Sequence, residues 1–314
     1  MHPHVEMEST RSAVLEAGLR FWGWEIPVYL FLGGLVAGLM LTVCAVIILR
    51  GREGVTQAMR LGLLGAPVLL SLGMGALFLD LALKLNVFRF YLTLRPYAPM
   101  SLGSWVLMLV YPVQALLVIA LPWAPLERMM GRFPLLAKLR AFAQGQVDRL
   151  AWAGLLAGFA LGIYTGVLLS TTVAAPLWSS GVLGFLFLAS GLSTGVAALM
   201  LVEKDHASQT LLAKADVVLI GLELLLLGGW IVGLATQGPV YREAVSVLIS
   251  GPYAPVFIGF VIFGGLLVPG ALETLSLQGR AKHSRTVPSL VLMGGLLLRF
   301  VVVYAGQEVT FYQA

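Results

Sequence analysis

The chain has 314 residues, of which 59% are hydrophobic and 11% are charged, and its formal net charge is +5. A soluble domain carries about 25% charged residues, so this composition excludes a soluble globular protein. The basic balance does not indicate nucleic-acid binding, because the cations lie in loops between apolar segments and there they report orientation.

Eight apolar segments follow one another along the chain, and each is long enough to cross a membrane as a helix, which needs about 20 residues. They do not alternate over about 10 residues as the strands of a membrane barrel do. We therefore predict an all-α integral membrane protein with eight transmembrane helices. The segments run near residues 26–49, 61–84, 101–123, 150–172, 180–201, 214–236, 253–275 and 287–306.

The cations outside the spans divide unequally between the two sides of the predicted membrane. Eight spans put both termini on one side, and positively charged loops stay in the cytoplasm. The side of the termini has six cations: Arg11, Arg20, Lys84, Arg89, Arg95 and Arg242. The other side has thirteen, from Arg50 to Arg285. Both termini are therefore expected outside the cytoplasm, with Trp22 and Trp178 in an aromatic belt at the membrane surface.

The sequence contains an ordered internal repeat. Pro-Tyr-Ala-Pro occurs at 96–99 and again at 252–255, and the Tyr-Thr-Gly at 164–166 is answered by Tyr-Ala-Gly at 304–306. Four spans repeated once give two halves of the same orientation, related by an axis along the membrane normal. We predict an outer tail at 1–25, a first four-helix bundle at 26–172, and a second bundle with a short tail at 173–314.

Candidate metal ligands are few, and none lies where a haem would need them. The four histidines, His2, His4, His206 and His283, are in the tail or in predicted loops. A bis-histidine haem requires imidazoles that face one another inside the bundle. The single cysteine, Cys44, forms neither a disulfide framework nor a thiolate metal site. We therefore expect no haem and no metal in this chain.

Two charged residues are predicted deep inside the membrane. Arg299 lies ~18 Å, and Glu223 ~14 Å, from the cytoplasmic starts of their spans at the helical rise. A lone charge at mid-membrane costs at least ~2.5–3.5 kcal/mol, which favours pairing. Either the two form a structural ion pair or they serve a proton or quinone-headgroup relay. Glu203, Asp216 and Glu273 lie near cytoplasmic ends, where we expect solvated side chains.

Polar and aromatic side chains gather towards the opposite, outer ends of the spans. The first span opens with Trp24, Glu25 and Tyr29, the second closes with Asp80, and the fourth carries Tyr164 and Thr165. Lys84 follows Asp80 by one turn, so a structural salt bridge is an alternative role for this carboxylate. Polar groups that converge just under the surface are suited to a lipophilic ring with polar oxygens.

Several motifs, in order, resemble the NrfD family, the membrane subunits of polysulfide reductase and related enzymes. They are YLFLGGLVAG at 29–38, LDLALKLNVFRF at 79–90, GIYTGVLLSTTVAAPLW at 162–178, FLFLASGLSTG at 185–195 and LLLRFVVVYAGQ at 296–307. The resemblance covers residues 21 to 308. It implies eight helices in two four-helix bundles, outward termini, no haem, and a location in a bacterial or archaeal cytoplasmic membrane.

The resemblance also implies a function. It implies a quinone, menaquinone or ubiquinone, bound near the outer surface, beside a ferredoxin-like iron–sulfur subunit that exchanges electrons with a molybdopterin-type catalytic subunit. In family members with a described pocket, the ring is contacted by the start of the first helix and by the tyrosine of the Tyr-Thr-Gly motif. Those places hold Glu25, Tyr29 and Tyr164, with Trp24 and Thr165 beside them. Some members have histidine and asparagine where this chain has Tyr29 and Ile26.

The expected reaction divides between these residues. Tyr29 and Tyr164 hold the quinone oxygens, and Glu25 or Asp80 takes protons, because tyrosine does not accept a proton at neutral pH as histidine does. The loops 85–100 and 237–252 are the expected docking surface for the partner. A secondary transporter or ion-translocating membrane protein is the alternative, because Pro67, Pro112 and Pro269 fall within spans and transporters have helices broken near the midplane. A purely structural anchor, with the quinone bound elsewhere, is a third option.

Overall fold

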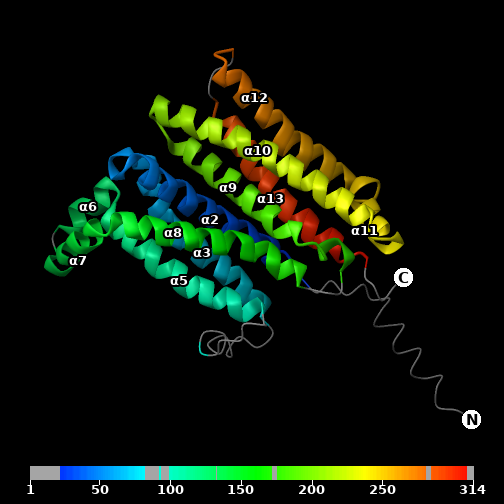
Figure 1. Ribbon diagram of the computed structural model, residues 1–314, viewed down its shortest axis with the longest axis horizontal. Coiled ribbons are helices and arrows are strands. Elements are labelled where there is room, and N and C mark those ends of the chain that lie inside the picture. Colours follow the sequence, from blue (N-terminus) through cyan, green and yellow to red (C-terminus); the bar gives the residue numbers. More distant parts are fainter. Residues whose placement is uncertain are drawn as a thin grey trace, which may run out of the picture.

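The computed structural model describes residues 22–81, 92, 99–131, 133–171, 175–280 and 284–309. This described part is almost entirely helical and contains no strand (Figure 1). It has eight helices long and apolar enough to cross a membrane, which confirms the all-α, multi-pass membrane fold. They are α2 (Glu25–Arg50), α3 (Gln57–Asp80), α5 (Pro99–Ala120), α8 (Val147–Ser170), α9 (Val182–Val202), α10 (His206–Ala235), the consecutive η4 (Pro255–Leu267) and α12 (Val268–Leu277), and α13 (Thr286–Gly306).

Shorter helices occupy segments that the sequence analysis treated as loops. They are η1 (Arg52–Gly54), α6 (Ala124–Met130), α7 (Pro134–Gly145), η3 (Pro176–Trp178) and α11 (Pro239–Ile249). Pro134 and Pro239 are the first residues of α7 and α11. Proline is suited to that position because its N–H has no partner there and its φ is already helical. The expected docking loop at 237–252 is therefore built around a helix, whereas most of the 85–100 segment lies outside the described residues.

Helix α10 begins at His206, eight residues before the predicted start of the sixth span. Asp205 caps it, because its Oδ2 accepts a hydrogen bond from the backbone N–H of Ser208 at 2.8 Å. An N-cap aspartate satisfies one of the backbone donors that a helix N-terminus leaves without a partner. The same hydrogen bond lowers the pKa of the Asp205 carboxyl. The polar start of this helix hid it from an analysis based on hydropathy.

The spanning helices form two groups of four with the same order of neighbours. In the first group α2 packs against α3 and α8, and α5 packs against α8 and α3. In the second group α9 packs against α10 and α13, while η4 and α12 pack against α13 and α10. The groups meet where α9 lies against α2 and α8, and where α13 lies against α2 (Figure 1). This arrangement is consistent with the predicted repeat, which stays a prediction, as do the domain boundaries.

Glycines bring the backbones of α2 and α9 into direct contact at the centre of the molecule. A Cβ added to Gly38 would lie 2.0 Å from the carbonyl oxygen of Gly191, and one added to Gly195 would lie 2.4 Å from the carbonyl carbon of Gly38. Small residues allow this close approach between membrane helices, where van der Waals packing drives association. We call Gly34, Gly38, Gly191 and Gly195 the glycine seam.

The prolines inside spans do not break the helices. Pro67 lies within the continuous α3 and Pro112 within the continuous α5. The seventh spanning helix changes its winding instead, from the wider π-helix η4 to the α-helix α12 at Val268. Pro269 follows immediately, and a proline cannot donate to the hydrogen-bond ladder of the preceding turn. The helix crosses without an unwound segment.

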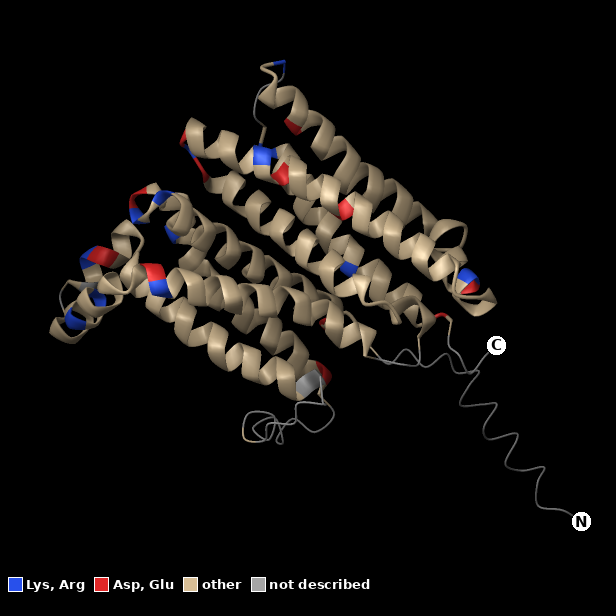
Figure 2. Ribbon diagram, viewed as in Figure 1, with Lys and Arg blue, Asp and Glu red and all other residues tan. Residues whose placement is uncertain are grey.

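Charged residues lie mainly at the two ends of the helix groups (Figure 2). The lateral surface instead exposes large apolar side chains, among them Leu72, Leu109, Leu156, Val218 and Phe260. A surface of this kind faces lipid. A few charged positions nonetheless lie within α10, α12 and α13, and they are described below.

Candidate functional site

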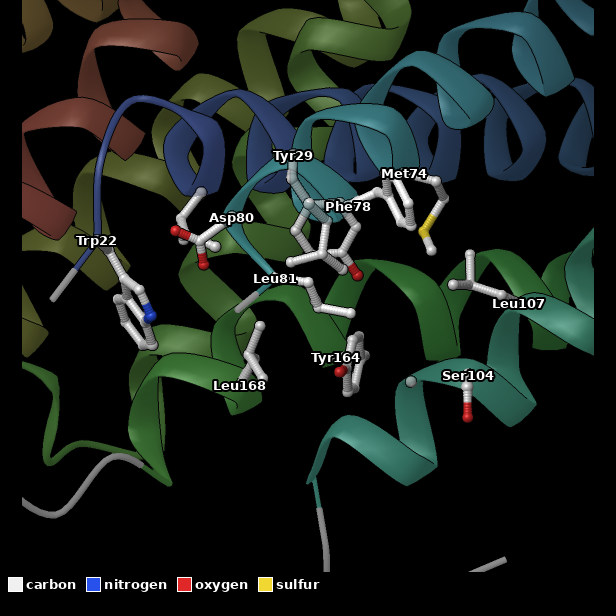
Figure 3. Close-up of a pocket in the computed structure, with 13 residues that line it drawn as sticks. Trp22, Tyr29, Met74, Phe78, Asp80, Leu81, Ser104, Leu107, Tyr164 and Leu168 are labelled. Carbon is white, nitrogen blue, oxygen red and sulfur yellow. The ribbon is translucent and has the colours of Figure 1, made fainter. Parts of the chain in front are cut away.

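A cavity of about 100 Å³ lies at one end of the first helix group. Its walls come from the start of α2, the end of α3, the start of α5 and the end of α8, because successive helices run in opposite directions. Its lining residues are Trp22, Ile26, Tyr29, Met74, Leu77, Phe78, Asp80, Leu81, Gly103, Ser104, Leu107, Tyr164 and Leu168 (Figure 3). The walls are mostly apolar, with a few polar groups.

Two predicted residues, Tyr29 and Tyr164, face this cavity from opposite walls (Figure 3). Tyr29 lies one turn inside α2 and is 1% exposed, whereas Tyr164 lies near the end of α8 and is 8% exposed. Their burial shields both phenols from water. The sequence placed these two tyrosines near the same membrane surface, and the structure brings them to one cavity.

The position of Tyr164 depends on a glycine of the neighbouring helix. A Cβ added to Gly103 of α5 would lie 2.1 Å from both Cζ and Oη of Tyr164. The phenol therefore lies in the space that any larger residue at position 103 would fill. Gly103 thus lines the cavity, and its role is to leave space for the phenol of Tyr164.

Asp80 is the last residue of α3 and lines the cavity, where its side chain is half-buried. Glu25, the first residue of α2, is also half-buried and lies close enough to interact electrostatically with Asp80. The structure thus brings together the two carboxylates that the sequence suggested as proton acceptors, with Asp80 on the cavity wall. The alternative partner Lys84 lies outside the described residues.

Two other predicted residues do not line the cavity. Trp24 is 51% exposed just before α2 and is not among the lining residues. Thr165 is fully buried, but its hydroxyl donates to the carbonyl of Gly162 at 2.7 Å, and its methyl group packs near Gly33. The physical reason is helical geometry, since Thr165 is rotated by about 100° from Tyr164 and faces α2.

Trp22 forms a wall of the cavity and is held by the second half of the chain. Its ring stacks on Trp178 with centroids 5.0 Å apart. Its backbone N–H donates to Gln307 at 3.0 Å, and its carbonyl accepts from the same side chain at 3.2 Å. Trp178 is 3% exposed and donates to the carbonyl of Val302 at 2.8 Å, so the expectation that it lies in a membrane-surface belt was wrong.

Most of the apolar lining was missed by the sequence analysis, although a signal was present. Four lining residues follow the helical spacing i, i+3, i+4, i+7, which puts them on the face of α3 that borders the cavity. They are Met74, Leu77, Phe78 and Leu81. Helical positions counted back from Leu81, the residue after Asp80, would have identified this face. Gly103 gave no such signal, because the need for a small residue appears only when Tyr164 is placed against it.

A second polar region lies in the interior of the molecule, around Arg299 of α13. This side chain is fully buried. Its Nη1 donates to the Ser190 hydroxyl and to the Gly295 carbonyl at 2.9 Å, and its Nη2 donates to the Phe187 carbonyl at 3.1 Å. The guanidinium carbon lies 4.9 Å from the centre of the Phe187 ring, a distance suited to a cation–π interaction.

Glu223, the predicted partner of Arg299, is 2% exposed in the same region. The guanidinium hydrogen bonds go to Ser190 and to two carbonyls, not to Glu223. Ser190 lies between the two charged groups, because its hydroxyl also interacts with the Glu223 carboxylate. The two charges are therefore linked through a serine, and their mutual attraction acts at longer range.

The three acids near the opposite end are not solvated as expected. Glu203, Asp216 and Glu273 are 7%, 0% and 3% exposed. Glu203 has a structural role, because it accepts hydrogen bonds from the Thr56 hydroxyl at 2.5 Å and from the backbone N–H groups of Lys204 and Asp205. These contacts join the start of α3 to the end of α9. The surrounding protein covers all three side chains, which hydropathy alone does not reveal.

Comparison with known proteins gives concordant matches over nearly the whole sequence. The family model described as "Polysulphide reductase, NrfD" matches residues 15–310. The C subunit of polysulfide reductase from Wolinella succinogenes is 31% identical over 303 residues, covering 91% of this chain and 94% of that protein. The NrfD homolog of Haemophilus influenzae is 27% identical over 303 residues, covering 91% and 94%. NrfD of Escherichia coli is 26% identical over 309 residues, covering 91% and 95%.

Proposed function

The chain belongs to the polysulphide reductase NrfD family and is a membrane subunit of a redox complex, and on that premise we propose that it is the subunit that exchanges electrons with membrane quinone. The observation that carries the proposal is the cavity at the end of the first helix group, where Tyr29 and Tyr164 face each other across apolar walls beside Asp80.

The residues of the cavity fit a quinone ring. Such a ring has a flat apolar body with two oxygens on opposite edges. Met74, Leu107 and Leu168 supply apolar contact, and tyrosine hydroxyls on facing walls supply donors. Menaquinone or ubiquinone, when bound, supplies the chemistry of two electrons and two protons.

The protein's own groups position the ring and move protons. Tyr29 and Tyr164 donate hydrogen bonds to the two oxygens and fix the orientation of the ring. The apolar walls and Trp22 exclude water. The Asp80 carboxylate accepts a proton from a ring hydroxyl, and Glu25, half-buried beside it, passes the proton to the outer water. A positioned carboxylate contributes to such a proton transfer by general base catalysis.

Subunits of this family work with catalytic and iron–sulfur subunits. We assign the electron acceptor, or donor, to a ferredoxin-like iron–sulfur subunit that docks over the cavity end and leads to a molybdopterin-type catalytic subunit. Helix α11 lies at that end and exposes Arg242, a cation suited to an acidic partner surface. We also propose that both termini lie on the outer side of the cytoplasmic membrane of a bacterium or archaeon.

Substitution of one hydroxyl tests the proposal. Tyr164→Phe keeps the ring and removes the hydrogen-bond donor. Quinol turnover by the assembled complex should therefore fall by a factor that corresponds to the loss of one hydrogen bond, about 1 kcal/mol or more. Tyr111→Phe is the matched control, because this tyrosine of α5 lies outside the lining and its hydroxyl pairs with Ser71. If quinol kinetics are unchanged in both variants, Tyr164 is not part of the quinone site.

A further inference from the structure

Two buried carboxyl groups meet inside the second helix group, at the end away from the cavity. Asp216 belongs to α10 and Glu273 to α12, and the side chains interact with each other directly. The Ser193 hydroxyl of α9 donates to Asp216 Oδ1 at 2.6 Å. No N–H or O–H group of the described residues donates to Asp216 Oδ2 or to either oxygen of Glu273.

The charged surroundings do not compensate two negative charges. The titratable group that faces Asp216 from its own helix is Glu223, which is another acid. Helix α9 contributes hydroxyls there, and Arg299 of α13 lies beside Glu223 at Ser190. Two carboxylates in contact, shielded from water, cannot both be ionised. One proton between them resolves the conflict, because a protonated carboxyl donates to the oxygen of its neighbour.

We propose that Asp216 and Glu273 form a proton-binding site that holds one proton between the two carboxyl groups and exchanges protons with Glu223. Uptake of a second proton makes the pair neutral, and release of that proton restores a single negative charge. The exchange involves protons only and no change of oxidation state. The site does not depend on what the cavity binds.

A row of polar groups connects this site with the interior. Ser193 and Ser190 lie one turn apart on the same face of α9, where residues at this spacing are neighbours. Ser193 bonds Asp216, and Ser190 contacts both Glu223 and Arg299. On α10, Asp216 lies ~15 Å and Glu223 ~26 Å from the helix start at the helical rise. The groups therefore extend from near one end of the bundle to its centre.

Labelling by dicyclohexylcarbodiimide tests the site without any redox assay. This lipophilic reagent adds across a protonated carboxyl group to give an O-acylisourea, which rearranges to a stable N-acylurea; an ionised carboxylate does not react. In membranes that contain the full complex, mass spectrometry should find one adduct per protein at Asp216 or Glu273. The double variant Asp216→Asn/Glu273→Gln, which keeps the side-chain volumes, should lose it. Lys214→Gln, which changes an exposed charge on the same helix, should keep it.

A second measurement covers the case in which the reagent does not reach the pair. Infrared difference spectra between the wild type and the double variant should show one carboxylic-acid C=O band that the variant lacks, whereas Lys214→Gln retains it. If the assembled double variant keeps every carboxylic-acid band of the wild type, the pair does not hold a proton and the proposal is wrong.

Discussion

The phenol of Tyr164 occupies the space that a side chain at Gly103 would fill, with a Cβ at position 103 lying 2.1 Å from the tyrosine oxygen. Gly103→Ala therefore displaces the phenol from its place without removing any functional group. We expect quinol turnover to fall about tenfold, which corresponds to ~1.4 kcal/mol in the activation free energy. Steady-state kinetics of the assembled complex measure it.

A glycine of the neighbouring helix provides the control for this substitution. Gly75 of α3 has no atom within 4 Å of an added Cβ, so Gly75→Ala should leave turnover unchanged. If Gly103→Ala also turns over normally, the placement of Tyr164 does not matter for quinol oxidation.

Removal of Arg299 should destabilise the assembled protein. Arg299→Leu takes away the cation beside Glu223, and Glu223→Leu takes away the anion, and breaking a buried charge pair on one side costs ~3–5 kcal/mol. Each single variant should therefore assemble in lower amount and melt at lower temperature in detergent. Arg285→Leu, an exposed change at the start of the same helix, should do neither.

The double variant Arg299→Leu/Glu223→Leu separates the two roles that the sequence left open. Neither charge is then stranded, so assembly should recover. We expect quinol turnover to stay low, because these groups adjoin the polar row that leads to Asp216. A double variant with normal turnover would make the pair purely structural, and two stable single variants would show that the charges do not support each other.

Reporter fusions test the orientation. An enzyme that is active only outside the cytoplasm should be active when fused after Ala314. The same enzyme placed after Gly279, at the turn between α12 and α13, should be inactive. The reverse pattern would overturn the arrangement with both termini outside.

The glycine seam should tolerate no added side chain. In Gly38→Ala the new Cβ meets the Gly191 carbonyl oxygen, so α2 and α9 must separate, at about 1–3 kcal/mol for overpacking. The melting temperature should fall, whereas Gly221→Ala, with open space around it, should leave it unchanged or raise it. The seam also opposes the transporter alternative, because rocking of one half against the other requires these backbones to slide.

The sequence was sufficient to predict the transmembrane helices, because a run of about 20 apolar residues has few stable structures other than a helix that crosses the membrane. It also placed Tyr29, Tyr164 and Asp80 correctly at one end, since depth follows from position along a helix. Rotation about the helix axis was harder to predict. Thr165 follows Tyr164 directly and still faces another helix, and Trp24 lies two residues from Trp22 and does not line the cavity.

Burial of the acids was missed for a related reason. Asp216 and Glu273 lie near the ends of their predicted spans, where hydropathy predicts solvent. Helix α10 begins ten residues before Asp216, and both side chains are buried. Their contact joins residues 57 positions apart on different helices, and no local pattern reports it. The position of Ser190 between Arg299 and Glu223 could likewise not be predicted, because Ser190 belongs to a predominantly apolar helix.

The attachment of Trp22 to Gln307 has a consequence for biogenesis. The first four spanning helices can enter the membrane early in synthesis, yet one wall of their cavity is held by a residue just beyond the final helix. The cavity can therefore take its described shape only after Gln307, which lies 285 residues beyond Trp22, has been synthesised. A product truncated before Gln307 would keep the first four spanning helices but lack both hydrogen bonds that hold the Trp22 backbone at the cavity wall.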